Sequence, residues 1–455
     1  MIKYHSTNKK SKKVSFKTAL FKGQAPDKGL FMPDRLPKFS QREINSMRRL
    51  KFPQIAFLIL KKFLKGEIPE KTLKEITQKA FNFDLPIEKV SLNLFVLRLD
   101  RGPTASFKDF GARFLAKCME YFLKKEKKKM VILVATSGDT GSAVAQAFYG
   151  IENVKVVVLF PEKEVVKNQR KQITTLGGNI ISVAIKGKFD DCQAMVKKAF
   201  ADAQLKHLNL SSANSINVAR LIPQITYYFF AFCKICKRGE KVIFSVPCGN
   251  FGNLTAGIFA KRMGLPVFKF VAAVNENDEF PRFLETGKYK PLIPSKKCLS
   301  NAMNIGHPSN LARIVEIYGG RMDETGKILK PPDMNALKKE IWSTKITDKE
   351  TKEAIKSAFQ KYHLVLEPHG AVAWRALEKF LEKEKIHFPA VVLETAHLGK
   401  FPEILKDLLK IKIEIPSSIK NSLKKKEKFE ILPPNYEEFK EFLKSVIPSH
   451  SKAPL

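Results

Sequence analysis

One lysine of this chain stands in a setting that favours covalent chemistry. Residues 102–111 read Gly-Pro-Thr-Ala-Ser-Phe-Lys-Asp-Phe-Gly, which places Lys108 between Phe107 and Phe110. Apolar neighbours desolvate an amine and weaken its preference for the charged form, and a neutral amine attacks a carbonyl to form a Schiff base. A surface lysine at the start of a helix would explain the same residues, so the rest of the chain must decide.

A second stretch is suited to binding a phosphate. The predicted strand 241–246 is followed by Pro-Cys-Gly-Asn-Phe-Gly-Asn at 247–253 and then by a predicted helix. Two glycines between a strand and a helix N-terminus let successive amides face one point, where the helix dipole favours negative charge. No Gly-Lys-Ser/Thr follows, so the stretch is not a P-loop. A tight strand-to-helix turn is the alternative interpretation.

The stretch 136–142 repeats this geometry earlier in the chain. It reads Thr-Ser-Gly-Asp-Thr-Gly-Ser and lies between a predicted strand and a predicted helix. Its amides and hydroxyls suit a carboxylate or a phosphate. Helix capping by Ser137, Asp139 or Thr140 would also explain it.

Two other segments carry polar groups that could face a ligand. Residues 211–220 open a predicted helix at 216–236, with Asn214 and Ser215 as natural caps and Arg220 about one turn in. An arginine grips a phosphate bidentately, although an isolated one is more often part of a surface ion pair. Thr395 follows the predicted strand 389–394, at the strand end where cleft ligands bind.

The elements that must position these residues predict an α/β protein. Short apolar runs alternate with amphipathic segments, as in parallel strands covered by helices on both faces. The first series has strands at 130–135, 154–160 and 179–185 with helices at 140–149, 163–176 and 189–204. The second has strands at 241–246, 267–274 and 389–394 with a helix at 253–263. We expect two parallel-sheet lobes with a cleft between them.

The predicted domains follow from changes in texture along the chain. Residues 1–83 carry helical patterns at 40–64 and 70–82 and predict a small, mainly helical domain. Residues 84–410 hold both α/β lobes, the smaller at about 125–215. Residues 411–455 form a basic extension with one helix, near 435–446, and a loose tail.

Composition narrows the class of protein. The chain has 81 Lys and Arg residues and 45 Asp and Glu residues, which gives a net charge of +36. The excess positive charge is spread along the chain and its basic clusters lack interleaved aromatic residues, so we expect no nucleic-acid partner. No apolar run approaches the roughly 20 residues needed to cross a bilayer, so we expect no membrane partner. Six scattered cysteines predict a reducing cytoplasm, and no metal constellation is evident.

Five motifs together resemble one family. Gly-Pro-Thr-x-x-Phe-Lys-Asp, Thr-Ser-Gly-Asp-Thr-Gly, Asn-Ser-Ile-Asn-x-x-Arg, Gly-Asn-Phe-Gly-Asn and Thr-Ala-His occur in order, over residues 1–410. This pattern resembles the threonine synthases, pyridoxal-phosphate enzymes of the fold-type-II, or tryptophan-synthase-β, superfamily. The chain departs from the family at Asp100-Arg101, where His is usual before Gly-Pro-Thr, at Leu398-Gly399, and at Cys248, where Ser is commoner.

The resemblance implies a role for each motif. Lys108 would form the Schiff base with pyridoxal phosphate, and Thr395 would offer its hydroxyl to the pyridine nitrogen. The cofactor phosphate would be held by Gly249, Asn250, Phe251, Gly252 and Asn253. The substrate's carboxylate and phosphate ends would contact Ser137, Asp139 and Thr140. The substrate phosphate would be bound by Asn214, Ser215 and Arg220.

The reaction implied is O-phospho-L-homoserine plus water giving L-threonine plus phosphate, by a cytoplasmic monomer or homodimer. The main alternative is another fold-type-II lyase, such as a serine or threonine dehydratase. A dehydratase needs no second phosphate site, so Arg220 discriminates between the two. A phospholigand-binding or nucleic-acid-binding protein without catalysis is the other alternative, and it would not need the amine of Lys108.

Overall fold

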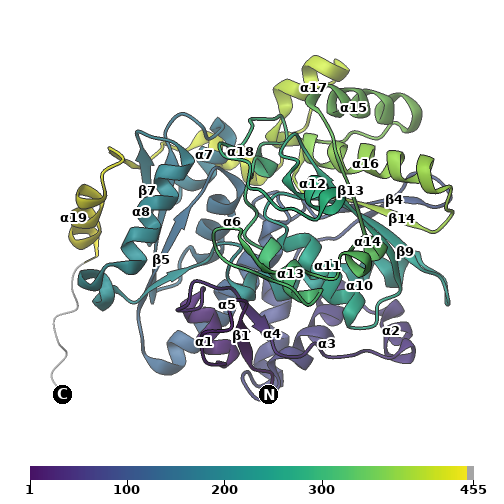
Figure 1. Ribbon diagram of the computed structural model, residues 1–455. Helices are drawn as coiled ribbons and strands as arrows, with labels where there is room; N and C mark the ends of the chain where they lie inside the picture. Colours follow the sequence, from purple (N-terminus) through teal and green to yellow (C-terminus); the bar gives the residue numbers. More distant parts are fainter. Residues whose placement is uncertain (448–455) are drawn as a thin grey trace.

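Two parallel sheets organise the chain, as the sequence predicts. The computed structural model describes residues 1–447 (Figure 1). One sheet has five parallel strands in the order β15-β7-β6-β5-β8, and the other has six strands in the order β13-β10-β9-β14-β4-β3. In the larger sheet only β3 runs antiparallel to its neighbour. The α/β fold class is confirmed.

The five-stranded sheet is the core of a smaller lobe. Its strands are apolar on both faces because helices cover both, which is the environment of a parallel sheet. The lobe contains β5 (Met130–Ala135), α6 (Asp139–Phe148), β6 (Val154–Pro161), α7 (Lys167–Thr174), β7 (Ile180–Ile185), α8 (Phe189–Ala201), the 3-10 helix η2 (Ala203–Leu208) and β8 (Leu210–Ser212).

The six-stranded sheet and its helices form the larger lobe. Its first elements, strands of the sheet and helices beside it, are β3 (Ile87–Lys89), β4 (Leu94–Arg98), α5 (Lys108–Glu126), α9 (Val218–Leu221), η3 (Ile222–Gln224), α10 (Ile225–Ile235), β9 (Val242–Pro247), α11 (Gly252–Arg262) and β10 (Val267–Val274). The chain continues through α12 (Glu279–Thr286), η4 (Asn301–Met303), α13 (Leu311–Ile317), β11 (Arg321–Met322), β12 (Ile328–Lys330), α14 (Met334–Glu340), β13 (Ile341–Lys345), α15 (Asp348–Tyr362), α16 (Pro368–Glu384), β14 (Ala390–Glu394), η5 (Leu398–Lys400) and α17 (Pro402–Leu409).

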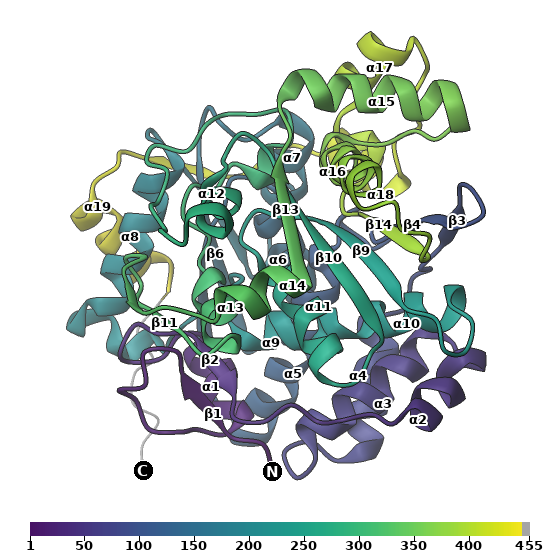
Figure 2. The ribbon, with the colours of Figure 1, turned by 45° about the vertical axis from the view of Figure 1, so that its right-hand side comes forward.

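The N-terminal residues are mainly helical and pack beneath the larger lobe (Figure 2). They form β1 (Tyr4–Ser6), α1 (Phe16–Lys22), β2 (Phe31–Pro33), α2 (Gln41–Ser46), η1 (Met47–Arg49), α3 (Phe52–Leu64) and α4 (Glu70–Ala80). The apolar faces of α3 and α4 are buried in the main core cluster, where Phe52 and Phe81 contact Phe110 of α5. This packing holds the start of α5 in place.

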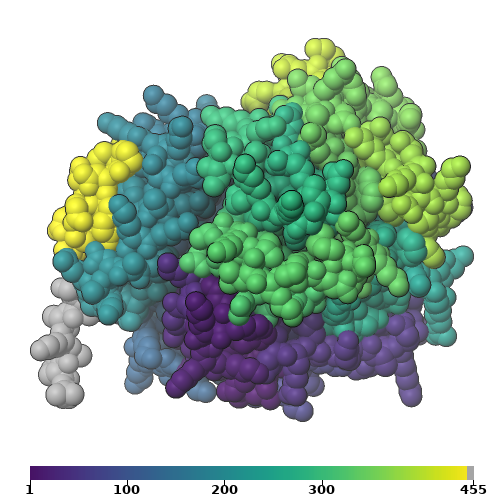
Figure 3. Space-filling view, viewed as in Figure 1, coloured from purple at the N-terminus to yellow at the C-terminus, as the bar shows by residue number. Residues whose placement is uncertain are grey.

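The last described segment has more structure than the single helix that we expected from the sequence. It forms α18 (Ser417–Lys424), β15 (Glu430–Leu432) and α19 (Tyr436–Val446), of which only α19 matches a predicted helix. Strand β15 pairs in parallel with β7, and α19 packs on α8, so the segment returns from the larger lobe to the smaller one (Figure 3). The expected tail beyond residue 447 lies outside the described residues.

The six predicted strands lie within one residue of β5, β6, β7, β9, β10 and β14, and the predicted helices lie within a few residues of observed ones. The predicted helix 216–236 is divided into α9, η3 and α10. The division falls at Pro223, whose nitrogen cannot donate a helical hydrogen bond. The sequence reading missed several strands, among them β4 and β13. Polar residues leave β13 without a continuous apolar run. Within residues 1–447 no helix is long and apolar enough to span a membrane.

Candidate active site

A tight turn presents Lys108 at the first position of α5. The carboxylate of Asp109 accepts hydrogen bonds from the backbone nitrogen of Thr104 at 2.9 Å and from its hydroxyl at 2.7 Å. Gly102 packs so closely on this carboxylate that a Cβ there would lie 2.4 Å from it. Ala105 adopts a φ of 56°, so the turn is tightly constrained. These local contacts fix the direction of the lysine.

The surroundings of Lys108 increase the fraction of its amine that is neutral, compared with an ordinary lysine. Burial lowers the pKa of Lys108 to about 8, and the positive charges of Lys400 and Arg220 act in the same direction. The carboxylate of Asp139 acts in the opposite direction. The side chain is only partly exposed to solvent. A substantial fraction of Lys108 is therefore neutral near physiological pH, as imine chemistry requires.

Thr395 lies beside this turn, although it is distant in sequence. Its carbonyl accepts a hydrogen bond of 2.9 Å from the backbone nitrogen of Phe107, and Ser106 forms a β-bridge with Ala396. The Thr395 side chain is nearly buried. Because β4 and β14 are parallel neighbours, their carboxyl ends bring the lysine turn and Thr395 together.

The predicted phosphate cradle follows β9. Phe251 has a φ of 60° and precedes α11, whose first turn begins at Gly252. Gly249 is required by packing, since a Cβ there would lie 2.8 Å from the carbonyl oxygen of Ala302. The backbone amides at a helix start suit an anion. The bend of the chain here is therefore suited to a phosphate.

Two asparagines of the cradle differ in their partners. Asn253 accepts hydrogen bonds from the hydroxyls of Tyr227 and Tyr228, at 2.6 and 2.7 Å, while its buried Nδ2 has no partner within the described chain. A buried donor that lacks an acceptor is costly, so Nδ2 is suited to an anionic ligand. Asn250 instead uses its side-chain oxygen to accept from the Ser309 hydroxyl at 3.2 Å.

The turn after β5 is braced by its own threonine. The hydroxyl of Thr136 accepts from the nitrogens of Gly138 at 3.0 Å and Gly141 at 2.9 Å. Gly138 has a φ of 153°, a conformation that favours glycine. Ser137 and Thr140 keep partly exposed side chains and remain candidates for substrate contact.

Asp139 has a different environment from its neighbours. It is buried, and its Oδ1 accepts from Lys400 Nζ at 2.6 Å and from Gln169 Nε2 at 2.8 Å. Burial acts to raise the pKa of Asp139, but Lys400 and Lys108 outweigh it and hold that pKa well below the ordinary range. A carboxylate repels an anion, so Asp139 is suited to balance these lysines rather than to touch a substrate carboxylate directly.

Arg220 is buried near the lysine rather than exposed on the surface. One terminal nitrogen donates to the carbonyl of Ala213 at 2.7 Å, while the buried Nε has no partner within the described chain. Burial lowers the pKa of Arg220 to about 10, so it stays charged at neutral pH. The side-chain oxygen of Asn214 is also buried without a partner. This region therefore has unused polar groups around a cation.

The helix cap in this region is not one of the predicted residues. Asn217 caps α9, since its side chain accepts from the nitrogen of Ala219 at 3.0 Å and donates to two backbone carbonyls. Ser215 instead offers its carbonyl to Asn310 and to the buried Arg313. The cap of α9 is thus Asn217 and not Asn214 or Ser215. The side chains of Asn214 and Ser215 are left available for other contacts.

A buried network that the sequence reading missed lies below Thr395. Glu367 accepts from His369 Nδ1 at 2.5 Å, and His369 Nε2 accepts from the nitrogen of Ala302 at 3.1 Å. This network positions Ala302 against Gly249 of the cradle. Glu394 is fully buried, and burial together with the nearby Glu367 raises its pKa well above the usual range. The network forms only in the folded protein, because Glu367 and His369 at the start of α16 meet Glu394 of β14 and Ala302 of η4.

His397 has a structural role. Its Nδ1 accepts from the nitrogen of Gly399 at 3.0 Å. Burial and then the positive charge of Arg101 lower the pKa of His397 to about 4, so it is neutral at physiological pH. Within residues 1–447, no group of three or more His, Cys, Asp or Glu side chains is placed to hold a metal ion.

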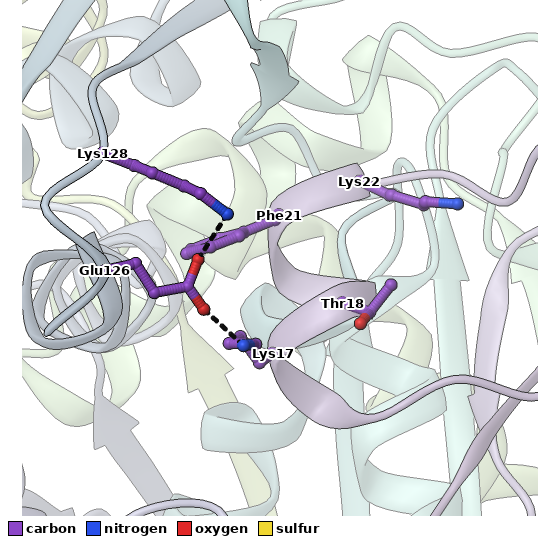
Figure 4. Close-up of a pocket in the computed structure, with 6 residues that line it drawn as sticks. All are labelled: Lys17, Thr18, Phe21, Lys22, Glu126 and Lys128. Carbon is purple, nitrogen blue, oxygen red and sulfur yellow. Dashed lines mark hydrogen bonds and ion pairs between the residues drawn. The ribbon is translucent and has the colours of Figure 1, made fainter. Parts of the chain in front are cut away.

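A surface groove elsewhere is a poorer candidate. It has a volume of about 590 Å³ and lies between α1 and the end of α5 (Figure 4). Glu126 in the groove forms ion pairs with Lys17 and, at 2.8 Å, with Lys128. The groove includes none of the residues that surround Lys108. Exposed ion pairs of this kind are common on protein surfaces and contribute little energy. We therefore place the candidate site at Lys108 and not in this groove.

Comparisons with known families show which proteins this chain is related to. A family model described as "Pyridoxal-phosphate dependent enzyme" matches residues 79–394, and "Threonine synthase N terminus" matches residues 3–81. "Threonine synthase, C-terminal" matches residues 370–443. The resemblance thus extends beyond residue 410, where we had expected it to end.

Individual relatives cover nearly the whole chain. The curated threonine synthase of Escherichia coli is 40% identical over 92% of this chain and 94% of its own length. The structure of the threonine synthase of Brucella melitensis with bound pyridoxal phosphate has a TM-score of 0.92 and 34% identity, covering 99% of this chain and 100% of that one. The yeast threonine synthase structure has a TM-score of 0.88 and 31% identity, covering 97% and 98%.

Members of the wider superfamily are more distant. The structure of a threonine deaminase from Solanum lycopersicum has a TM-score of 0.53 at 15% identity, covering 75% of this chain and 88% of that one. This likeness shows a shared fold and nothing further.

Proposed function

This chain belongs to the pyridoxal-phosphate-dependent threonine synthase family, and we propose that it converts O-phospho-L-homoserine and water to L-threonine and phosphate. The observation that carries this proposal is the combination of an amine suited to imine chemistry, Lys108, with two separate places suited to phosphate. One is the cradle after β9 and the other surrounds Arg220. A substrate that carries its own phosphate needs the second in addition to the first.

The residues present fit the cofactor. Lys108 would hold it covalently through Nζ, and the turn from Gly249 to Asn253 would hold its phosphate with backbone amides and the unpaired Nδ2 of Asn253. The Thr395 hydroxyl, close to the lysine turn, would meet the pyridine nitrogen. When bound, pyridoxal phosphate supplies an electron sink for a carbanion next to the amino group.

Lys108 would then move protons on the substrate. Its amine, with a pKa of about 8, is a base of suitable strength to take a proton from the substrate's Cα. Once it has returned that proton to another atom of the cofactor-bound substrate, the neutral amine would take a proton from Cβ. The neighbouring charges tune this function, since Lys400 and Arg220 favour the neutral amine and Asp139 favours the charged one. Buried surroundings exclude bulk water, which strengthens each of these interactions.

Arg220 would bind the substrate phosphate that departs from Cγ. Its buried Nε is a donor that the protein itself leaves unused. The resemblance implies that the neighbouring Asn214 and Ser215 contact the same phosphate. Such a site disfavours amino acids that lack a phosphate, because its donors would stay unpaired. This is why a serine or threonine dehydratase is the less suitable function.

A product assay tests the proposal. The purified holoprotein incubated with O-phospho-L-homoserine should release phosphate and L-threonine in equal amounts. Lys108→Ala should abolish this release, and borohydride reduction should tag the peptide containing Lys108 in the wild type alone. Release of 2-oxobutyrate from L-threonine, without threonine formation from the phosphorylated substrate, would favour a dehydratase.

The monomer or homodimer state and the cytoplasmic location remain part of the proposal. The cytoplasmic location is supported by six cysteines without disulfides.

A further inference from the structure

Lys400 is a buried cation to which the function described so far assigns no ligand. Its side chain has no exposed surface, and its Nζ lies 2.6 Å from Asp139 Oδ1. Lys400 ends η5 in the larger lobe, whereas Asp139 begins α6 in the smaller lobe. The ion pair therefore joins the two lobes through segments that follow the carboxyl ends of β14 and β5.

The hydrogen-bond capacity of Lys400 is not filled. An ammonium has three N–H donors, and within residues 1–447 the only protein acceptor bonded to Lys400 Nζ is Asp139. Asp139 Oδ1 also accepts from Gln169. Since a buried charged donor requires acceptors, the remaining N–H groups of Lys400 are suited to the oxygens of an anion that enters the site.

Lys400 and Arg220 are buried cations on different elements. Lys400 ends η5 and forms an ion pair with Asp139, whereas Arg220 lies in α9 and donates to the carbonyl of Ala213. The partly exposed hydroxyl residues Ser137 and Thr140 flank Asp139 on the same turn. The proposed substrate has two anionic groups, and Arg220 is assigned to its phosphate.

We propose that Lys400, held in place by Asp139, binds the α-carboxylate of the amino-acid substrate. This inference rests on the proposed function and adds to it a residue of the larger lobe. The carboxylate would then be held by Lys400 and the phosphate by Arg220. The charges of both cations lower the pKa of Lys108. The pairing with Asp139 neutralises Lys400 when no substrate is present, which explains how its charge tolerates full burial.

Two probes separate the two anionic groups. L-2-Aminobutyrate has the amine and the carboxylate without a phosphate, and 3-aminopropyl phosphate has the amine and the phosphate without a carboxylate. Their affinities for the holoenzyme can be measured by titration of the cofactor's visible absorbance. Lys400→Met should weaken L-2-aminobutyrate by about 10- to 100-fold, as expected for loss of a charge-assisted bond, and change 3-aminopropyl phosphate by less than about 3-fold. Arg220→Met should show the reverse pattern.

A second variant guards against a merely structural effect. Lys400→Met alone leaves Asp139 buried without its partner, which is destabilising. The double variant Lys400→Met/Asp139→Asn removes both charges and should unfold at a temperature close to that of the wild type, yet still bind L-2-aminobutyrate weakly. Wild-type affinity of the double variant for L-2-aminobutyrate, or equal weakening of both probes by Lys400→Met, would overturn the inference. If the wild type bound both probes selectively but made no threonine, only the proposed function would fail.

Discussion

At the residue scale, the chemistry of Lys108 depends on a balance of charges from three separate segments. Burial lowers the pKa of its amine to about 8, Lys400 and Arg220 lower it as well, and Asp139 raises it. A lysine in water would be almost wholly charged at neutral pH. The surroundings of Lys108 thus provide a fraction of neutral amine at neutral pH that can form a Schiff base.

The balance predicts opposite effects of two neighbouring substitutions. The rate of covalent cofactor attachment to the apoprotein should rise with pH through about 8, because the neutral amine of Lys108 is the reactive form. Asp139→Asn removes the charge that favours the ammonium and should lower the pH midpoint, whereas Lys400→Met should raise it. Stopped-flow absorbance of the bound cofactor gives the midpoints. Identical midpoints in all three proteins would contradict this account.

At the element scale, the C-terminal segment completes the smaller lobe. Strand β15 extends the five-stranded sheet at β7, and α19 covers α8. Arg170 of α7 and Glu427, between α18 and β15, form a two-bonded ion pair with distances of 2.9 and 3.2 Å. Phe439 and Leu443 of α19 are fully buried in the same cluster as Val183 of β7. These contacts make the segment part of the fold.

Two phenylalanines on α19 provide a matched comparison. Phe439 is fully buried, whereas Phe442 on the same helix is only partly buried. Phe439→Ala should lower the free energy of unfolding by about 3–5 kcal/mol through lost burial and a cavity, and Phe442→Ala should lower it clearly less. Urea denaturation followed by circular dichroism measures both. If the two substitutions cost the same, α19 is not anchored as described.

At the scale of the whole molecule, the net charge of +36 influences substrate capture rather than fold. The positive charge is distributed over the surface, and the proposed substrate carries a phosphate in addition to its carboxylate. A general positive potential raises the local concentration of such an anion and is screened by salt, with a Debye length of about 10 Å at about 0.1 M.

Salt should therefore affect anionic and zwitterionic ligands differently. Raising the ionic strength from about 20 mM to about 200 mM should reduce kcat/KM for O-phospho-L-homoserine several-fold, through KM, with kcat little changed. The affinity for the zwitterion L-2-aminobutyrate serves as the control and should stay nearly constant. Steady-state assays at matched pH measure the first and absorbance titration the second. An equal salt effect on both ligands would exclude steering by the protein's charge.

The sequence by itself determined the α/β fold, the main strands of both parallel sheets with several of their helices, and the motifs around Lys108 and after β9. These features depend on apolar periodicity and on turn residues, which act over a few neighbouring positions. The motifs meet because parallel strands bring their carboxyl ends to one edge of each sheet. The five motifs in order were enough to reveal the resemblance to the threonine synthases, which implied the cofactor and made Lys108 the candidate for its Schiff base.

Only the tertiary structure decided which partners the charged residues take. Lys400 and Asp139 are 261 positions apart, and β15 joins a sheet whose other strands end at residue 212. Asn217, rather than Asn214 or Ser215, caps its helix. Local pattern cannot specify such pairs, because burial and neighbouring charge arise only when the two lobes pack against each other, and it is this packing that sets the pKa of the reactive amine.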